Sequence, residues 1–220
     1  MEKILEAKNI SKQYPGVVAL DDVSFNVYKG KVNVLVGENG AGKSTLMKIL
    51  SGVERQTSGE IYLNGEKLEI FSTNDAENNS IGIIHQELNL FPNLTVHENI
   101  FMGHEILDRY KTIDTSRQIK ITNELLAKLN QDINAKTSVE SLRIGQQQII
   151  EIAKALAKKT KILIMDEPSS ALSKKEVSVM FEVIAELKKQ EVTIIYISHK
   201  LEEIMQIGDV ITILRDSKFI

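Results

Sequence analysis

Apolar and polar residues alternate along the first third of the chain, which is the period of strands with one buried face. The stretches ILEAKNI and VSFNVY follow this pattern, and EIYL and EKLEI flank the pair Asn64 and Gly65. An Asn-Gly pair between two such runs favours a tight hairpin, because both residues accept the positive φ of a type I′ turn. The first third of the chain therefore predicts an antiparallel β subdomain.

From residue 145 onward the pattern changes to helix, strand, helix, strand and helix, over residues 145–159, 161–166, 175–190, 192–198 and 200–206. Both strands are continuously apolar (ILIM and TIIYI), as expected for a parallel sheet buried on both faces, with right-handed crossovers. In the third of these elements, four apolar residues recur at helical spacing and are predicted to face the core, namely Val177, Phe181, Ile184 and Leu187. The end of the chain, ITILRDSKFI, predicts a strand, a turn and the start of a partner strand.

The middle of the chain, from about residue 88 to 140, is polar and helical in pattern. We predict an inserted helical subdomain there, with His97 and His104 at its surface. A chain of 220 residues suffices for one sizeable core, or for one core with a smaller lobe. The predicted class is α/β, with a mixed or mostly parallel central sheet, an N-terminal antiparallel β subdomain and the helical insertion.

Composition narrows the possible partners. Hydrophobic residues make up 42% of the chain and charged residues 26%, and the formal net charge of −3 argues against binding to nucleic acid by bulk charge. The absence of cysteine excludes disulfides and thiolate metal sites. The charged start MEKILEAKNI predicts no secretory signal, and no apolar run approaches the roughly twenty residues needed to span a bilayer. Any membrane role would therefore depend on a partner.

A phosphate-binding loop lies between an apolar strand and a helix in VNVLVGENGAGKSTLMKIL. Its G-x-x-x-x-G-K-S pattern predicts a backbone cradle for phosphates, with Lys43 reaching the β- and γ-phosphates and the Ser44 hydroxyl ligating Mg²⁺. The predicted nucleotide-binding residues of this P-loop NTPase core are Gly37, Glu38, Asn39, Gly40, Ala41, Gly42, Lys43, Ser44 and Thr45. The plainer alternative is a glycine-rich helix start with no ligand.

Two carboxylates follow the apolar strand in KILIMDEP. They are predicted to lie at the carboxyl edge of the sheet, where α/β proteins bind their ligands. Asp166 is expected to hold Mg²⁺ through water, and Glu167 to orient and deprotonate an attacking water. The alternative is that the two side chains only cap the next helix.

Two further strand ends are predicted to reach the same edge. His199 follows the strand in YISHK, and is a candidate donor to the γ-phosphate. Gln86 follows the strand in GIIHQ, and is a candidate ligand of Mg²⁺ or of the attacking water. Lys43, Gln86, Glu167 and His199 are therefore the predicted catalytic residues, and Ser44, Gln86 and Asp166 the predicted Mg²⁺ ligands.

Taken in this order, these residues resemble an ABC-type ATPase cassette over essentially the whole chain. The matching segments are Gly37–Thr45 (Walker A), Gln86 (Q-loop), Ile162–Asp166 with Glu167 (Walker B and catalytic base), Ser170–Leu172 (D-loop) and His199 (switch histidine). The resemblance also implies that Tyr14 stacks on adenine, although by itself Tyr14 would be read as a buried tyrosine. The implied ligands are ATP and Mg²⁺.

The resemblance further implies that SLRIGQQQ contains the signature motif, formed by Leu142, Arg143, Ile144, Gly145 and Gln146. In the family this motif closes over the γ-phosphate held by an opposite cassette. Two residues depart from the family pattern. Arg143 stands at the position of the usual serine, so a neutral hydroxyl is replaced by a charged guanidinium. Ser173 stands where the D-loop usually has aspartate.

Several stretches are most similar to the first cassette of the ATPase of bacterial monosaccharide importers, of the ribose type. The resemblance implies residues 1–220 as one nucleotide-binding domain of a longer protein with two fused cassettes. It also implies a membrane permease and an extracytoplasmic sugar-binding protein as partners, no nucleic acid, and a place on the cytoplasmic face of the cell membrane.

Other functions stay open at this stage. One is an ABC-type ATPase that acts on ribosomes or DNA, although the stretch between Gln86 and Leu142 is too short for the coiled coil of a DNA-repair form. Another is a cassette that binds ATP with little hydrolysis, which the charge of Arg143 favours. A GTPase is disfavoured because the chain has no N-K-x-D motif.

Overall fold

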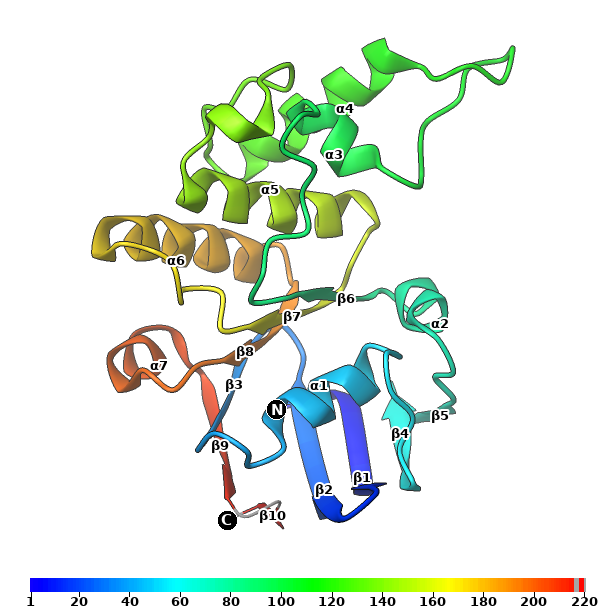
Figure 1. The fold of residues 1–220 in the computed structure, drawn as a ribbon, viewed down its shortest axis with the longest axis vertical. Helices are drawn as coiled ribbons and strands as arrows, with labels where there is room; N and C mark the ends of the chain where they lie inside the picture. Colours follow the sequence, from blue (N-terminus) through cyan, green and yellow to red (C-terminus); the bar gives the residue numbers. More distant parts are fainter. Residues whose placement is uncertain (216–217, 220) are drawn as a thin grey trace.

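The computed structural model describes residues 1–215 and 218–219 as an α/β structure with two sheets (Figure 1). The first sheet is antiparallel, with the order β2-β1-β4-β5. Its strands are β1 (Lys3–Tyr14), β2 (Val17–Tyr28), β4 (Ser58–Leu63) and β5 (Glu66–Leu68). Asn64 and Gly65 have φ of 52° and 83° and join β4 to β5 in the predicted hairpin.

The second sheet has the order β10-β9-β3-β8-β7-β6. Its strands are β3 (Val32–Gly37), β6 (Ile81–Ile84), β7 (Ile162–Asp166), β8 (Thr193–Ile197), β9 (Val210–Arg215) and β10 (Lys218–Phe219). Every pairing from β9 to β6 is parallel, and β10 alone is antiparallel to its neighbour. The prediction of a mixed, mostly parallel sheet is confirmed, while the turn predicted at residues 216 and 217 lies outside the described residues.

Helices cover both faces of the parallel sheet. They are α1 (Lys43–Leu50), α2 (Thr73–Asn78), α5 (Ile144–Ala157), α6 (Lys174–Lys189) and α7 (Leu201–Ile207). Successive residues of β7 point to opposite sides, so that Leu163 and Met165 join one apolar cluster with α5 and α6, while Ile162 and Ile164 join another with α1 and the antiparallel sheet. The parallel sheet is therefore buried on both faces, as its continuous apolar strands predict.

A smaller group of helices packs on α5, above the sheet in the orientation of Figure 1. It consists of α3 (Val96–Phe101), α4 (Thr115–Lys128) and the 3₁₀ helix η1 (Val139–Ser141). No helix in residues 1–215 and 218–219 is long and apolar enough to cross a membrane.

The surface position predicted for His97 is wrong. Its side chain lies in the packed helical group and the residue is only 6% exposed. The reason is that five of the six residues of α3 are buried, so this short helix is enclosed on more than one face. Two polar residues of α3, His97 and Asn99, are therefore buried, while Glu98 stays exposed. His104 is half-buried, against the ring of Phe101.

Candidate functional site

The ends of β3, β6 and β7 meet at one edge of the parallel sheet, because the three strands run in the same direction. A cavity of about 460 Å³ opens there. It is lined by Val17, Val18, Ala19, Asn39, Gly40, Gly42, Lys43, Ser44, Thr45, Gln86, Asp166 and Glu167. Most of the residues predicted to bind nucleotide or metal therefore surround one space.

The phosphate loop follows β3 and depends on glycine. Gly40 and Gly42 have φ of 83° and 100°, a conformation that other residues adopt only with strain. A Cβ atom at Gly42 would also lie 2.5 Å from the carbonyl oxygen of Ala19. Gly42 is the N-cap of α1, and no side chain caps that helix. The first turn of α1 is thus open to an anion, which its dipole and backbone N–H groups favour.

Lys43 is buried at this helix start, with 6% of the residue exposed. Its ammonium group donates hydrogen bonds to the carbonyl oxygens of Gly37 and Glu38, at 2.7 and 2.9 Å. Both acceptors belong to the phosphate loop itself, and no carboxylate of residues 1–215 and 218–219 forms an ion pair with this lysine. The site therefore presents a fixed positive charge at the cavity wall.

Asp166 ends β7 opposite the loop and is partly buried. Burial raises the pKa of this carboxyl, and so does the neighbouring Glu167 carboxylate, while His85, Lys43 and the Ser44 hydroxyl favour ionisation. A divalent cation would relieve the repulsion between the two carboxylates. The described residues contain no group of three or more His, Cys, Asp or Glu side chains that could hold a metal. The set of Ser44, Gln86 and Asp166 fits Mg²⁺, which takes few protein ligands and completes its shell with water and phosphate.

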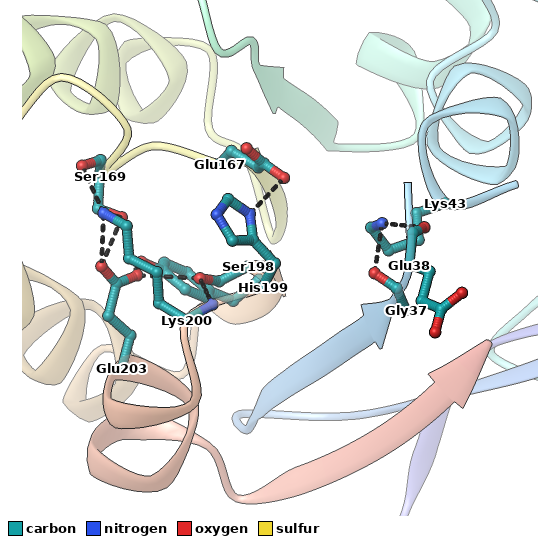
Figure 2. A network of polar contacts seen from close by, with 10 residues as sticks. Gly37, Glu38, Lys43, Glu167, Ser169, Ser198, His199, Lys200 and Glu203 are labelled. Carbon is teal, nitrogen blue, oxygen red and sulfur yellow. Dashed lines mark hydrogen bonds and ion pairs between the residues drawn. The ribbon is translucent and has the colours of Figure 1, made fainter. Parts of the chain in front are cut away.

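Glu167 and His199 form a pair beside Asp166. Nδ1 of His199 lies 3.0 Å from Oε1 of Glu167, and since an ionised carboxylate only accepts, the imidazole donates through this nitrogen (Figure 2). Glu167 has a φ of 45°, which is uncommon for a residue with a side chain, and its N–H donates to the carbonyl of Ile197 at 3.1 Å. The backbone of β8 thus holds Glu167 in a strained conformation. His199 does not itself line the cavity, but it contacts a residue that does.

Gln86 lies two residues after β6 and is exposed at the cavity. The loop that follows it is tied to α5, because the N–H of Asn89 donates to Glu151 at 2.7 Å and Lys154 donates to the Asn89 carbonyl at 3.1 Å. A shift of α5 would therefore move the loop that contains Gln86.

The predicted signature residues are absent from the lining of this cavity. They begin α5, where the N–H of Arg143 donates to the side chain of Gln146 at 3.1 Å. The N–H of Gly145 donates to the Glu176 carboxylate at 3.2 Å, and a Cβ at this glycine would lie 2.7 Å from Cγ of Glu176. Ser173 is the N-cap of α6, which gives this departure from the family pattern a local structural role.

Tyr14, Gly37, Glu38 and Ala41 also lie outside the lining. Tyr14 ends β1 half-buried, with the ammonium of Lys12 5.0 Å from its ring centre, so it is not a buried core tyrosine. Three residues that the sequence did not suggest also line the cavity, namely Val17, Val18 and Ala19. Val17 and Val18 are 61% and 49% exposed. In the sequence they look like residues of an ordinary strand. Only the exposure of Val17 and Val18 in the structure distinguishes them from core residues.

A second group of polar residues was also missed. Ser169, Ser198, Lys200 and Glu203 form a hydrogen-bonded cluster next to the Glu167 and His199 pair (Figure 2). Tyr196 joins this cluster through its hydrogen bond to Glu203. No local motif marks these residues, because Ser169 follows β7 whereas the other four lie in β8, in the loop after it and in α7.

Comparison with known proteins agrees with this geometry. The model of the ABC transporter family matches residues 20–170. A ribose import ATP-binding protein, RbsA, of Rhodopirellula baltica is 51% identical over 97% of this chain and 42% of its own length. A xylose import ATP-binding protein, XylG, of Geobacillus kaustophilus is 47% identical over 99% of this chain and 43% of its own length. The chain thus spans less than half the length of these curated relatives.

Solved structures show the same fold. A nucleotide-free ATP-binding cassette from an ABC transporter superposes with a TM-score of 0.89 and 24% identity, over 99% of this chain and 90% of its own. A cassette in its ADP conformation gives a TM-score of 0.89 with 25% identity, over 100% of this chain and 90% of its own. The family match covers more than half of the chain and includes the phosphate loop and both carboxylates, and the chain therefore belongs to the ABC transporter family as an ATP-binding domain.

Proposed function

We propose that this domain binds and hydrolyses ATP to power the import of a monosaccharide through a membrane permease. The observation that carries the proposal is the cavity at the sheet edge, where the phosphate loop, Lys43, Asp166 and Glu167 face one another. The names of the relatives, ribose and xylose import ATP-binding proteins, support the sugar as cargo.

Each part of the cavity has a role in this proposal. The backbone of residues 37–45 and Lys43 hold the triphosphate, and Tyr14 stacks on the adenine. Ser44, Asp166 and Gln86 are the protein ligands of Mg²⁺, which supplies charge neutralisation on the phosphates when bound. Glu167 accepts a proton from the attacking water, and His199 donates a hydrogen bond toward the γ-phosphate.

The pairing of Glu167 with His199 has a chemical consequence. Because Nδ1 of His199 donates to the carboxylate, the other ring nitrogen is the acceptor when the imidazole is neutral. Donation to the γ-phosphate then requires either a protonated ring or a rotation of His199 away from Glu167. The exposure of 57% for the His199 side chain leaves room for that rotation.

We propose further that residues 1–220 form one nucleotide-binding domain with a helical subdomain at about 88–140, and that it is the first of two cassettes in a longer protein. The relatives are more than twice as long as the matched region, which supports a second cassette. In this arrangement Leu142, Arg143, Ile144, Gly145 and Gln146 complete the site of the opposite cassette.

The partners follow from the same proposal. The cassette binds the permease at the cytoplasmic face of the membrane. An extracytoplasmic protein delivers the sugar to the permease. No role in binding nucleic acid is proposed, in keeping with the net charge of −3.

The experiment that tests the function is Mg²⁺-dependent phosphate release from ATP. We expect release by the full-length protein, and an increase when the permease and the loaded sugar-binding protein are present in liposomes. The isolated chain of 220 residues serves as the comparison and should be slower, since it lacks the opposite cassette. If the full-length protein binds ATP but releases no phosphate, the result would instead support the alternative function, a cassette that binds ATP with little hydrolysis. The charge of Arg143 favours that alternative.

Arg143→Ser in the full-length protein is expected to change kcat for ATP by less than about a hundredfold, which is the range of one charge-stabilising donor. The reason is that the Arg143 side chain is exposed, while its backbone N–H donates to the Gln146 side chain. This backbone hydrogen bond does not depend on the side chain at position 143, so the backbone of the signature keeps its shape. Steady-state kinetics of the variant measure the change. Total loss of turnover would show that the guanidinium is essential.

A further inference from the structure

Glu203 is a buried carboxylate outside the nucleotide cavity. It lies in the first turn of α7, and the residue is 6% exposed. The Ser169 hydroxyl lies 2.7 and 2.8 Å from its two oxygens, the Tyr196 hydroxyl donates at 2.8 Å, and the Ser198 hydroxyl at 3.1 Å (Figure 2). The Lys200 ammonium completes the shell at 3.1 Å. All of these partners are side chains, so the Glu203 carboxylate does not cap its own helix.

The donors come from the two segments that carry the proposed catalytic pair. Ser169 lies two residues after Glu167, and Ser198 directly precedes His199. Lys200 adds a direct link between these segments, because its ammonium also donates to the Ser169 carbonyl at 3.0 Å. One carboxylate therefore fixes the distance between the loop after β7 and the loop after β8.

The charge of Glu203 is compensated in the folded protein. Burial acts to raise the pKa of Glu203, but the hydrogen bonds from Ser169, Tyr196 and Lys200 outweigh it and leave the pKa below its ordinary value. A buried ionised group whose hydrogen bonds are all satisfied is held rigidly, and removing one donor or acceptor destabilises the folded protein. The cluster thus holds both loops in one arrangement.

We propose that Glu203 is a positioning residue, which sets the geometry of the Glu167 and His199 pair by holding Ser169 and Ser198 together. The proposal rests on the ATPase function given above. Glu167 has a positive φ and makes a 3.0 Å hydrogen bond to His199, so its carboxylate reaches the attacking water only while both loops keep their places. Displacement of a catalytic group by about 1 Å costs up to about a hundredfold in rate.

The test is Glu203→Gln in the full-length protein, with Glu202→Gln as the control. Glutamine keeps the size of the side chain but places an NH₂ group where one oxygen now accepts, and the Lys200 ammonium cannot accept from it. Glu202 is the neighbouring exposed residue, and its substitution removes the same charge from the same helix. We expect kcat for ATP to fall about 10- to 100-fold in Glu203→Gln, with the Kd of a non-hydrolysable ATP analogue within about threefold of the wild type.

Ser169→Ala and Tyr196→Phe provide milder variants, should Glu203→Gln fail to fold. Each removes one hydroxyl, and we expect each to lower kcat with little change in Kd. The double variant Ser169→Ala with Glu203→Gln should be less impaired than the product of the two single effects, since both act on one network. If these residues have a purely structural role, the substitutions will lower the melting temperature and the fraction of binding-competent protein but leave kcat per bound nucleotide unchanged. That result would overturn the proposal. A wild-type protein without ATP hydrolysis would overturn the proposed function instead.

Discussion

Glu167→Gln in the full-length protein is expected to lower kcat for ATP hydrolysis by about 10²- to 10⁴-fold, the range of a positioned general base. An amide cannot take the proton of the attacking water, although it can still hydrogen-bond to it. Affinity for ATP should stay close to that of the wild type, because in the proposed function the loop amides and Lys43 hold the phosphates. Removing one of two adjacent carboxylates also lowers the repulsion that raises the pKa of Asp166, which favours metal and nucleotide binding.

Two measurements separate the roles of Glu167. Single-turnover phosphate release gives the chemical step, and titration with ATP and Mg²⁺ gives the Kd. Glu182→Gln is the matched control, since Glu182 is exposed on α6 and does not line the cavity. Undiminished turnover in Glu167→Gln would remove Glu167 from the role of base. A large loss of ATP affinity would show that it acts in binding instead.

The sequence predicted those parts of the site that depend on one strand and the turn after it. The apolar runs before Gly37, Asp166 and His199 identify buried parallel strands, and parallel strands must end at a common edge. The positions of these residues follow from that rule alone. The Asn64 and Gly65 hairpin was predictable for a similar reason, because the turn conformation is a property of the two residues.

The sequence could not predict features that arise from contact between distant segments. Glu203 reads as an acidic residue in the first turn of a helix, where glutamate is common, and its partners become visible only when β7 and β8 pair. Val17 and Val18 fit a strand pattern, yet they face the cavity because the antiparallel sheet packs against α1. His97 is buried because α3 contacts both α4 and α5. In each case the environment of the residue depends on several elements at once.

Lys43→Ala is expected to weaken binding of ATP and Mg²⁺ about 10- to 100-fold, and to lower kcat by about 10²- to 10³-fold. In the structure Lys43 is buried and its ammonium donates to two carbonyl oxygens of its own loop, so its charge is available to the phosphates. A charge-assisted hydrogen bond of this kind contributes about 1.5–3 kcal/mol to binding, and more to a transition state in which negative charge shifts among the phosphate oxygens.

Two further variants distinguish the charge of Lys43 from its volume. Lys43→Met keeps most of the buried aliphatic chain and should lose affinity as Lys43→Ala does, because the positive charge is what both lack. Lys48→Ala removes an exposed lysine from the same helix and should leave binding unchanged. Titration with a non-hydrolysable ATP analogue measures all three. If Lys43→Ala and Lys43→Met both bind as tightly as the wild type, the phosphates do not lie in this loop, and the cavity at the sheet edge is not the nucleotide site.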